Sequence, residues 1–299
     1  MDAKPTQAER CGKEKPAIDG QTPFGGRRPG PIARAAWSLA TARGASSGLR
    51  RFLRKRLALR FRGPYDVAAD GLGMRVYPAE NHCDRTVLGR GELPEKPERA
   101  LIEPLLANGM TFVDIGANVG VYSLFVSQRT GGTATVLAFE PHPRTFAKLD
   151  FNCAQNGFDR IVRVNAGVAG TEAETVLFSD GGGNIGNASL LKSVGIGREE
   201  IAIRLRPLAA VLAEQAIDRI DLLKIDVEGF EDQALMPFFE TAPADLWPSY
   251  VLLETVHRGF WRYDLESELV RRGYTVIGST EENLLLGRAA TQERVGAAR

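Results

Sequence analysis

The fold is decided by a ten-residue stretch, TFVDIGANVG at residues 111–120. It begins with apolar and β-branched residues, which are typical of a buried strand, and runs directly into a turn that holds Gly116 and Gly120. A helical pattern follows to about residue 129. Glycines at such a turn let the backbone approach a ligand closely. The stretch therefore predicts the first strand and helix of a ligand-binding sheet.

Strand and helix patterns alternate along the rest of the chain. Apolar runs of strand length occur at residues 135–140, 161–168, 220–226 and 250–254, and helical patterns begin near residues 143, 207, 230 and 264. Strands that alternate with helices need crossover connections, which produce a mainly parallel sheet covered on both faces. Two closing strands, at 274–277 and 283–287, have no helix between them and can pair only as antiparallel strands. The predicted fold class is α/β, a doubly wound, Rossmann-like and mainly parallel sheet with antiparallel closing strands.

The N-terminal segment has a different composition. Residues 1–48 are rich in Gly, Pro, Ala, Ser and Arg without a sustained apolar period, which indicates disorder. The next stretch, LRRFLRKRLALRF at 49–61, spaces its apolar residues by three and four, and this predicts a short basic amphipathic helix. A small hairpin is expected from residues 71–78 and 86–88. The predicted organisation is a basic, largely disordered arm at 1–65 and one catalytic domain at 66–299.

The charge of the chain is divided between these two parts. The 299 residues carry 38 basic and 37 acidic side chains, a formal net charge of +1. Residues 20–65 contain eleven Lys and Arg and no Asp or Glu, whereas residues 66–299 contain 23 basic and 33 acidic residues. Residues 49–62 could contact an anionic membrane, and an entry helix that only docks on the domain is an equal alternative. We expect no specific nucleic-acid partner, because the arm has few interleaved aromatic residues and the body is acidic.

The overall composition restricts the class of protein. Hydrophobic residues make up 43% and charged residues 25%, which argues against a wholly disordered, collagen-like or membrane-embedded chain. The three cysteines are widely separated and fit neither a disulfide framework nor a paired zinc site. No apolar run has the length of a secretory signal or of a spanning helix. We expect a cytoplasmic protein, with peripheral contact at the inner membrane face as an option for the arm.

Two carboxylates follow the first two strands of the predicted sheet. Glu140 is placed to accept both hydroxyls of a ribose, as acidic residues do in nucleotide-binding sheets, and Asp114 could meet an ammonium group. Either carboxylate alone could instead cap a helix. A dinucleotide fingerprint, G-x-G-x-x-G, is not matched from Gly116, because Asn118 and Val121 stand at the second and third glycine positions. A phosphate-binding Gly-Lys-Ser/Thr turn is also absent from the sequence.

Four stretches occur in a characteristic order: FVDIGANVGVYS at 112–123, FEPHPRTFAKLDFNCAQNG at 139–157, NASL at 187–190 and LLKIDVEGFE at 222–231. Together they resemble the FkbM-type S-adenosylmethionine-dependent methyltransferases, over roughly residues 70–288. The resemblance implies methyl transfer to oxygen, most often on a sugar or another secondary-metabolite hydroxyl. It also implies a set of cofactor-binding residues, namely Asp114, Gly116, Ala117, Asn118 and Gly120 for the methionine part, Glu140 for the ribose and Asn165 for the adenine region.

Acidic residues and a histidine follow the two later strands. Asp226 and Glu228 could orient and deprotonate an acceptor hydroxyl, or they could ligate a magnesium ion, which is possible but not implied. Capping of the next helix is an equal alternative for this pair. His257 alone among the three histidines follows a strand end that faces the cleft, and Glu254 could fix its tautomer. The candidate catalytic residues are therefore His257, Asp226, Glu228 and Glu254, with a structural role open for the histidine.

One loop adds a candidate lid. The Gly- and Asn-rich segment GGGNIGN at 181–187 lies between hairpin strands expected at 174–179 and 200–206, and it could be an acceptor wall or an ordinary long turn.

The leading interpretation is methyl transfer from S-adenosylmethionine to a small-molecule or carbohydrate acceptor, on a hydroxyl of a sugar, glycolipid or secondary metabolite. The alternatives are a nicotinamide-dependent oxidoreductase and a non-catalytic module that binds membrane or nucleic acid through its basic arm.

Overall fold

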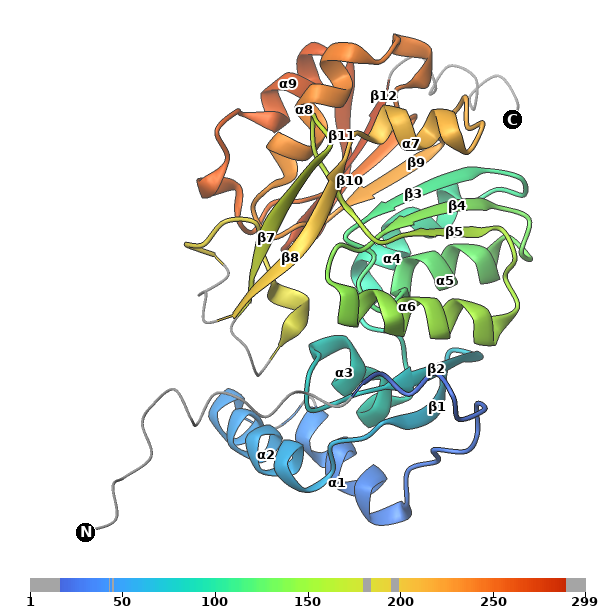
Figure 1. Cartoon of the computed structure of the whole chain (residues 1–299), viewed down its shortest axis with the longest axis vertical. Coiled ribbons are helices and arrows are strands. Elements are labelled where there is room, and N and C mark those ends of the chain that lie inside the picture. The colour runs from blue at the N-terminus through green and yellow to red at the C-terminus, as the bar shows by residue number, and fades with distance from the viewer. Residues whose placement is uncertain (1–16, 43, 45, 180–183, 195–198, 289–299) are drawn as a thin grey trace.

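The structure, a computed structural model, describes residues 17–42, 44, 46–179, 184–194 and 199–288. Its centre is a seven-stranded sheet with the order β11-β12-β10-β9-β3-β4-β5 (Figure 1). The strands are β3 (Thr111–Ile115), β4 (Thr135–Phe139), β5 (Ile161–Val164), β9 (Leu222–Ile225), β10 (Tyr250–Glu254), β11 (Tyr274–Ser279) and β12 (Asn283–Arg288). The first five strands are parallel, and β12 pairs antiparallel with both β10 and β11. The predicted fold class is confirmed, with the closing hairpin inserted at the β10 edge.

Helices cover both faces of this sheet. Residues that alternate along β3 separate into two hydrophobic cores, since Phe112 belongs to one and Val113 to the other. The first core includes side chains of α5 (Val121–Arg129) and α6 (Pro143–Asn156), and the second includes side chains of α7 (Leu208–Glu214), α8 (Glu231–Thr241) and α9 (Leu265–Arg271). The two-sided burial explains why the central strands read as continuous apolar runs.

The third predicted strand, residues 161–168, is two strands in the structure. β5 ends at Val164, and the chain bends at Ala166 before β6 (Gly167–Val168). β6 joins β8 (Glu199–Arg206) and β7 (Ala173–Ser179) in a separate three-stranded sheet with the order β6-β8-β7. This second sheet lies beside the carboxyl ends of the central strands, so it can form one wall of a site there (Figure 1).

The segment before β3 packs on the sheet as helices and a hairpin. It contains α1 (Pro31–Thr41), α2 (Ser47–Arg60), β1 (Tyr65–Ala69), β2 (Leu72–Val76), α3 (His82–Arg90) and α4 (Lys96–Ile102). The disorder that composition indicated for residues 1–48 does not apply to α1, where the side chains of Trp37 and Ala40 are fully buried. Apart from Trp37, the buried residues of α1 are small, namely Ala33, Ala40 and Thr41, and composition alone did not distinguish them from a flexible segment. Residues 1–16 lie outside the described part of the chain.

The predicted hairpin also has a different partner. β2 pairs antiparallel with β1 through a two-residue Asp70-Gly71 turn, and residues 86–88 lie inside α3. Both turn residues have positive φ, +49° for Asp70 and +85° for Gly71. An Asp-Gly pair is a strong signal for such a hairpin turn, and the sequence prediction overlooked it.

Helix α2 covers Ser47–Arg60, where the sequence predicted a helix at about 49–61. Its apolar residues divide between two roles. Leu53 and Leu57 pack against the hydrophobic core, whereas Leu49 and Phe52 are 50% and 56% exposed. The helix is therefore docked on the domain and still presents apolar side chains outward. Of the helices that can be described, none combines the length and the apolar character that crossing a bilayer requires.

Candidate active site

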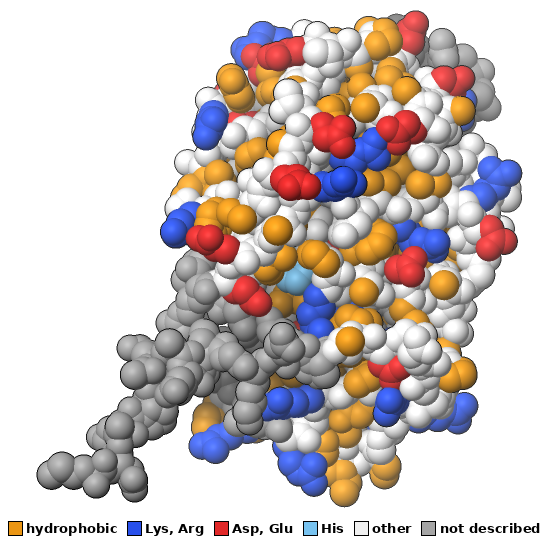
Figure 2. Space-filling model, viewed as in Figure 1, with side chains coloured by type: hydrophobic (Ala, Val, Ile, Leu, Met, Phe, Trp, Pro, Cys, Tyr) orange, Lys and Arg blue, Asp and Glu red, His pale blue; other side chains and the backbone are white. Residues whose placement is uncertain are grey.

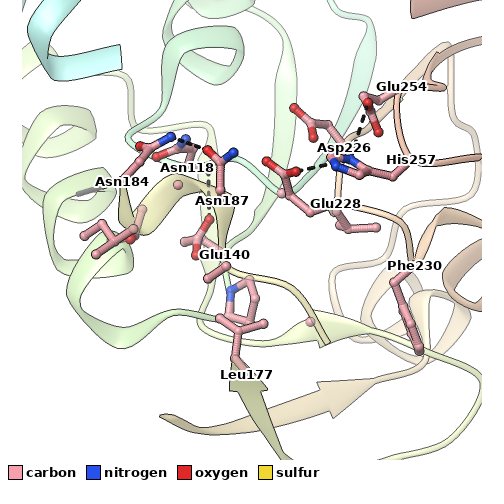
Figure 3. Close-up of a pocket in the computed structure, with 18 of the residues that line it drawn as sticks. Asn118, Glu140, Leu177, Asn184, Asn187, Asp226, Glu228, Phe230, Glu254 and His257 are labelled. Atoms are coloured by element: carbon pink, nitrogen blue, oxygen red, sulfur yellow. Dashed lines mark hydrogen bonds and ion pairs between the residues drawn. The ribbon is translucent and has the colours of Figure 1, made fainter. Parts of the chain in front are cut away.

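A cavity of about 410 Å³ opens at the carboxyl ends of β3, β4, β9 and β10 (Figure 3). This is the edge at which sheets of this class bind ligands. Seven of the eleven residues predicted for the site line the cavity: Gly116, Asn118, Glu140, Asp226, Glu228, Glu254 and His257. The other four, Asp114, Ala117, Gly120 and Asn165, are not among its lining residues. The rule that ligands bind at the carboxyl ends of the strands, called the strand-end rule below, therefore located the cavity but not every side chain that lines it.

The turn after β3 forms the floor of the cavity. Gly116 has φ +78°, and a Cβ atom there would lie 1.9 Å from the carbonyl oxygen of Asp226. Asn118 also has positive φ, +51°. Only glycine allows the β3 turn to pass this close to the end of β9. The requirement for glycine at position 116 is thus a packing requirement as well as a conformational one.

Asp114 lies beneath this floor. Its side chain is fully buried, and its Oδ2 accepts a hydrogen bond of 2.7 Å from the Ser123 hydroxyl. The ammonium of Lys224 lies 3.7 Å from its Oδ1 and donates to the Gly116 carbonyl at 2.9 Å. Burial raises the pKa of Asp114. Asp114 thus supports the floor through Lys224 and does not line the cavity, and its contact with a cofactor stays a prediction.

Four asparagines line one end of the cavity: Figure 3 shows Asn118, Asn184 and Asn187, and the fourth, Asn81, contacts Asn118. The Asn81 amide donates to the Asn118 side-chain oxygen at 2.8 Å, and Asn184 contacts Asn187. Asn184 also accepts from the backbone N–H of His82 at 2.9 Å. This end is uncharged and rich in donors and acceptors, a composition that suits a zwitterionic group.

Glu140 stands beside the asparagines. Its two oxygens accept backbone hydrogen bonds, from Asn118 at 3.0 Å and from His142 at 2.9 Å. Burial raises the pKa of Glu140 to about 7. Asn165 is exposed, and its amide donates to the carbonyl oxygens of Glu140 and Pro141. Asn165 thus stabilises this turn and is not among the residues that line the cavity, so its role at the adenine stays a prediction.

The opposite end of the cavity holds the predicted catalytic residues. His257 Nδ1 lies 3.3 Å from Glu228 Oε2 and 3.9 Å from Glu254 Oε1. Glu228 is thus the closer carboxylate to the imidazole. Glu254 Oε1 instead accepts a hydrogen bond of 2.7 Å from the Val256 N–H. Asp226 contacts Lys224, with Oδ2 3.6 Å from Nζ. The four residues predicted from two strand ends are thus brought to one place.

Burial sets the protonation of these carboxyl groups. It raises the pKa of Glu228 to about 8 and that of Glu254 to about 9, and the charge of Asp226 adds to both shifts. Glu228 has φ +55°, an uncommon backbone conformation for a residue with a side chain. Perturbed carboxyl groups beside a histidine in a cavity are typical of a site that transfers protons. Among the residues that the structure describes, we find no group of three or more His, Cys, Asp or Glu side chains that could hold a metal ion.

The segment after β7 closes over the cavity. Residues 184–188 line it, and Gly186 comes so close to Asn118 that a Cβ atom would lie 2.9 Å from the Asn118 amide nitrogen. Ser189 is fully buried and donates a 2.7 Å hydrogen bond to the carbonyl oxygen of Glu228. The predicted acceptor wall therefore corresponds to residues that contact both ends of the site. The remainder of that loop, residues 181–183, lies outside the described residues.

Sequence reasoning missed several lining residues, among them Asn81, Glu95 and Glu282. Asn81 carried only the signal of a helix N-cap, a role it also fills, since its side chain accepts from the Cys83 N–H at 2.8 Å. Burial raises the pKa of Glu95 to about 7, and its φ of +58° is equally invisible in the sequence. These residues come from segments outside the parallel strands, so no strand-end rule could select them.

Known proteins resemble this chain in the same region. Residues 114–263, about half of the chain, match the family model described as the methyltransferase FkbM domain. Methyltransferase sdnD of Sordaria araneosa is 29% identical over 201 residues, which are 57% of this chain and 75% of that protein. Methyltransferase 1 of Beauveria bassiana is 28% identical over 140 residues, 41% of this chain and 56% of that protein.

A solved structure of the same description gives a weaker likeness. The methyltransferase FkbM from Methylobacillus flagellatus aligns with a TM-score of 0.42 and 16% identity, over 84% of this chain and 58% of that one. This chain thus spans a little more than half of two of these three proteins. The family model covers β3 to the residues after β10, which are the elements that build the cavity. On that match, this chain belongs to the FkbM methyltransferase family.

Proposed function

We propose that the chain transfers a methyl group from S-adenosylmethionine to a hydroxyl oxygen of a sugar, a glycolipid or a secondary metabolite. The observation that carries this proposal is the division of one cavity into two chemically different ends. The asparagine end and Glu140 suit a zwitterionic nucleoside, and the carboxylate and histidine end suits a group that must lose a proton.

The residues present fit this cofactor. The volume of about 410 Å³ lies within the ordinary range of ligand pockets. Asn118 and its asparagine neighbours would hold the amino-acid part, and the Glu140 carboxylate would accept hydrogen bonds from the ribose hydroxyls. When bound, the cofactor supplies an electrophilic methyl carbon whose departure leaves the bonding pair on sulfur as a neutral thioether.

The chain itself would orient the acceptor and remove one proton. The acceptor oxygen forms the new bond to carbon, and its proton passes to a base. His257 is the leading candidate, because its Nδ1 lies beside Glu228 and its ring is 24% exposed at the cavity. Glu228 and Glu254 would stabilise the imidazolium that results. Positioning contributes much of the rate in such a transfer, so the base is expected to matter less than the geometry.

The direct test measures binding and transfer separately. We expect labelled S-adenosylmethionine to bind the purified chain, whereas a nicotinamide cofactor should not bind. A screen of extracted sugars, glycolipids and small metabolites with the labelled cofactor would then identify methylated products by mass and by the atom modified. Failure to bind S-adenosylmethionine would eliminate the proposal, and a product labelled on nitrogen or carbon would eliminate its oxygen specificity.

A second proposal concerns the basic segment: it contacts an anionic membrane surface. The described exposed apolar residues of α1 and α2 include Ile32, Leu39, Leu49 and Phe52. Figure 2 shows Lys and Arg side chains next to hydrophobic ones on the part of the molecule where Figure 1 places these helices. Burial, and after it the charges of Arg54 of α2, Arg85 and Arg90, lowers the pKa of cavity-lining His82, so the basic surface adjoins the cavity. Such a surface would bring an acceptor in a lipid layer close to the site.

A further inference from the structure

Five carboxyl groups line the cavity near Asp226, whose charge acts on the other four, and they are Glu95, Asp226, Glu228, Glu254 and Glu282. They come from separate parts of the chain, before α4, after β9, at the end of β10 and before β12. Figure 3 shows Asp226, Glu228 and Glu254 close together around His257. Among the described residues that line the cavity there is no Lys or Arg. This end therefore concentrates carboxyl groups with no guanidinium or ammonium group in its wall.

Glu254 has an oxygen without a partner. Its side chain is only 9% exposed, and Oε1 accepts from the Val256 N–H. Oε2 is buried and has no hydrogen-bond partner among the described residues. Buried polar atoms in folded proteins almost always have a partner, so an unpaired carboxylate oxygen in a cavity wall points to a donor from a ligand.

The nearby cation and the other nearby acid are already engaged. Lys224 lies behind the wall, where it contacts Asp114 and Asp226 and donates to the Gly116 carbonyl. Glu231 accepts hydrogen bonds from the Val227 and Gly229 N–H groups and from the Trp261 indole. Glu228 and Glu254 have no cation other than His257 within ion-pair distance among the described residues. Burial, and after it the charges of Asp226 and Glu231, raises their pKa values to about 8 and about 9, so both carboxyl groups hold a proton at neutral pH until a cation binds beside them.

We infer that this carboxylate end binds the acceptor through a protonated amine that lies beside the hydroxyl to be methylated, as in an amino sugar or an amino alcohol. The inference rests on the proposed methyl transfer and adds the class of acceptor. An ammonium group beside Glu228 and Glu254 supplies the donor that Glu254 Oε2 lacks and offsets the repulsion that arises when both carboxyl groups ionise. A neutral polyol supplies donors but no charge.

The cofactor is a second source of positive charge, and the test must separate the two. S-adenosylmethionine carries a positive sulfonium, whereas S-adenosylhomocysteine has a neutral sulfur. We therefore compare ligands on the full chain saturated with S-adenosylhomocysteine. The probes are D-glucosamine, D-galactosamine and D-mannosamine, each beside its hydroxyl counterpart and its N-acetyl derivative, with binding followed by ligand-observed NMR and calorimetry.

We expect the amino sugars to bind about tenfold or more tightly than their neutral counterparts, as a charge-assisted hydrogen bond to a buried carboxylate gives. Glu254→Gln and Glu228→Gln should each remove most of this preference, since Gln keeps the shape of the side chain and loses its charge. The matched control is Glu240→Gln, an exposed carboxyl on α8 that does not line the cavity, and it should leave the preference intact. Melting temperatures of the three variants check that each is folded.

Three results would overturn the inference: equal binding of neutral and amino sugars, no binding of any amino sugar, or an amine preference that survives both cavity substitutions. A loss of affinity for S-adenosylmethionine but not for S-adenosylhomocysteine in Glu254→Gln would assign the carboxylates to the sulfonium and would also overturn it. If the unmodified chain binds neither form of the cofactor, the proposed function itself fails, so the two failures are distinguishable.

Discussion

The imidazole Nδ1 of His257 lies 3.3 Å from the Oε2 atom of Glu228. The two residues follow different strands, β10 and β9, which pair in parallel register so that their carboxyl ends coincide. Glu228 reaches this position with a positive φ, and the adjacent Gly229 also has positive φ, +94°. Two residues with unusual backbone conformation after β9 thus place a carboxylate against the histidine that follows β10.

This pair predicts a separation of binding from chemistry. His257→Gln should lower kcat by about 10²–10⁴-fold, the usual contribution of a general base. The affinity for S-adenosylmethionine should not change, because the cofactor is assigned to the asparagine end and Glu140. Single-turnover rates with the identified acceptor and calorimetry with the cofactor measure the two quantities. An unaltered kcat would remove His257 from the mechanism.

A second prediction concerns Glu140. Only its ionised form accepts hydrogen bonds with both oxygens, so affinity for the cofactor should fall as the pH drops below about 7, the pKa to which burial raises this carboxyl. Glu140→Gln should weaken binding about tenfold at pH 8 and remove that pH dependence. Titrations at pH 6 and pH 8 provide the measurement. The control Glu240→Gln, at an exposed position, should bind the cofactor as the unmodified chain does at both pH values. If Glu140→Gln also bound the cofactor as the unmodified chain does at both pH values, the assignment of Glu140 to the ribose would be disproved.

The buried carboxyl groups also predict how stability depends on pH. The pKa values of Glu95 and Glu140 rise to about 7, that of Glu228 to about 8 and that of Glu254 to about 9, from a value of 4.5 for a free side chain. Between pH 4.5 and the raised pKa of each group, the folded chain holds a proton that the unfolded chain has released. The contribution of these groups to the stability of the ligand-free chain is therefore fully present below about pH 4.5. That contribution is lost as the pH rises toward 9.

Thermal unfolding at pH 6 and pH 9 checks this sign. The melting temperature should be lower at pH 9 than at pH 6. In a chain of this size it falls by about 2–4 °C for each kcal/mol of stability that is lost. Glu254→Gln mimics the protonated carboxyl and should reduce the difference between the two pH values. A melting temperature that rises between pH 6 and pH 9, or a variant with the full difference, would show that these carboxyl groups are ionised in the folded chain at neutral pH.

Much of the sheet and part of the site followed from sequence patterns. Glu140, Asp226 and Glu254 were found because the carboxyl ends of parallel strands meet at one edge, and the structure places all three in the cavity wall. Asp114 failed the same rule, since a side chain at a strand end can point below the floor as readily as into the cavity. Asn165 also follows a strand end, but its amide donates to the carbonyl oxygens of Glu140 and Pro141 and it does not line the cavity.

The remaining differences come from long-range packing. Asn81 and Glu95 reach the cavity because the N-terminal hairpin and helices dock beside the sheet, and no local pattern encodes that docking. The helix α1 was missed because its buried stripe, apart from Trp37, consists of small residues. Local composition measures how hydrophobic a segment is, whereas burial depends on what surface it meets. Close approach of α1 to Gly89 of α3 is an example, since a Cβ there would lie 2.2 Å from the Thr41 hydroxyl oxygen.

Ser189 predicts a positioning effect. Its hydroxyl donates to the Glu228 carbonyl and accepts from the Leu191 N–H at 3.0 Å, so it links the segment over the cavity to the residue beside His257. Ser189→Ala leaves a carbonyl group unpaired, at a cost of about 1–3 kcal/mol. We expect a lower kcat with cofactor affinity nearly unchanged, and partial rescue by Ser189→Thr. An equal loss of kcat and of cofactor affinity would instead indicate general loosening of the cavity.

The last prediction tests the membrane proposal without deleting the N-terminal segment, because Trp37 and Ala40 are buried in the core and a truncated chain would lose that packing. The double substitution Leu49→Ser and Phe52→Ser removes two exposed apolar side chains from α2. Burial of such a side chain in lipid contributes about 1.5–3 kcal/mol, so partitioning to phosphatidylglycerol vesicles should fall at least about tenfold, with no change in melting temperature. Val270→Ser, an equally exposed apolar position on α9, is the matched control. Equal partitioning of the double variant and the unmodified chain would reject the membrane contact, and steep salt-dependent binding to generic RNA would assign the basic surface to nucleic acid instead.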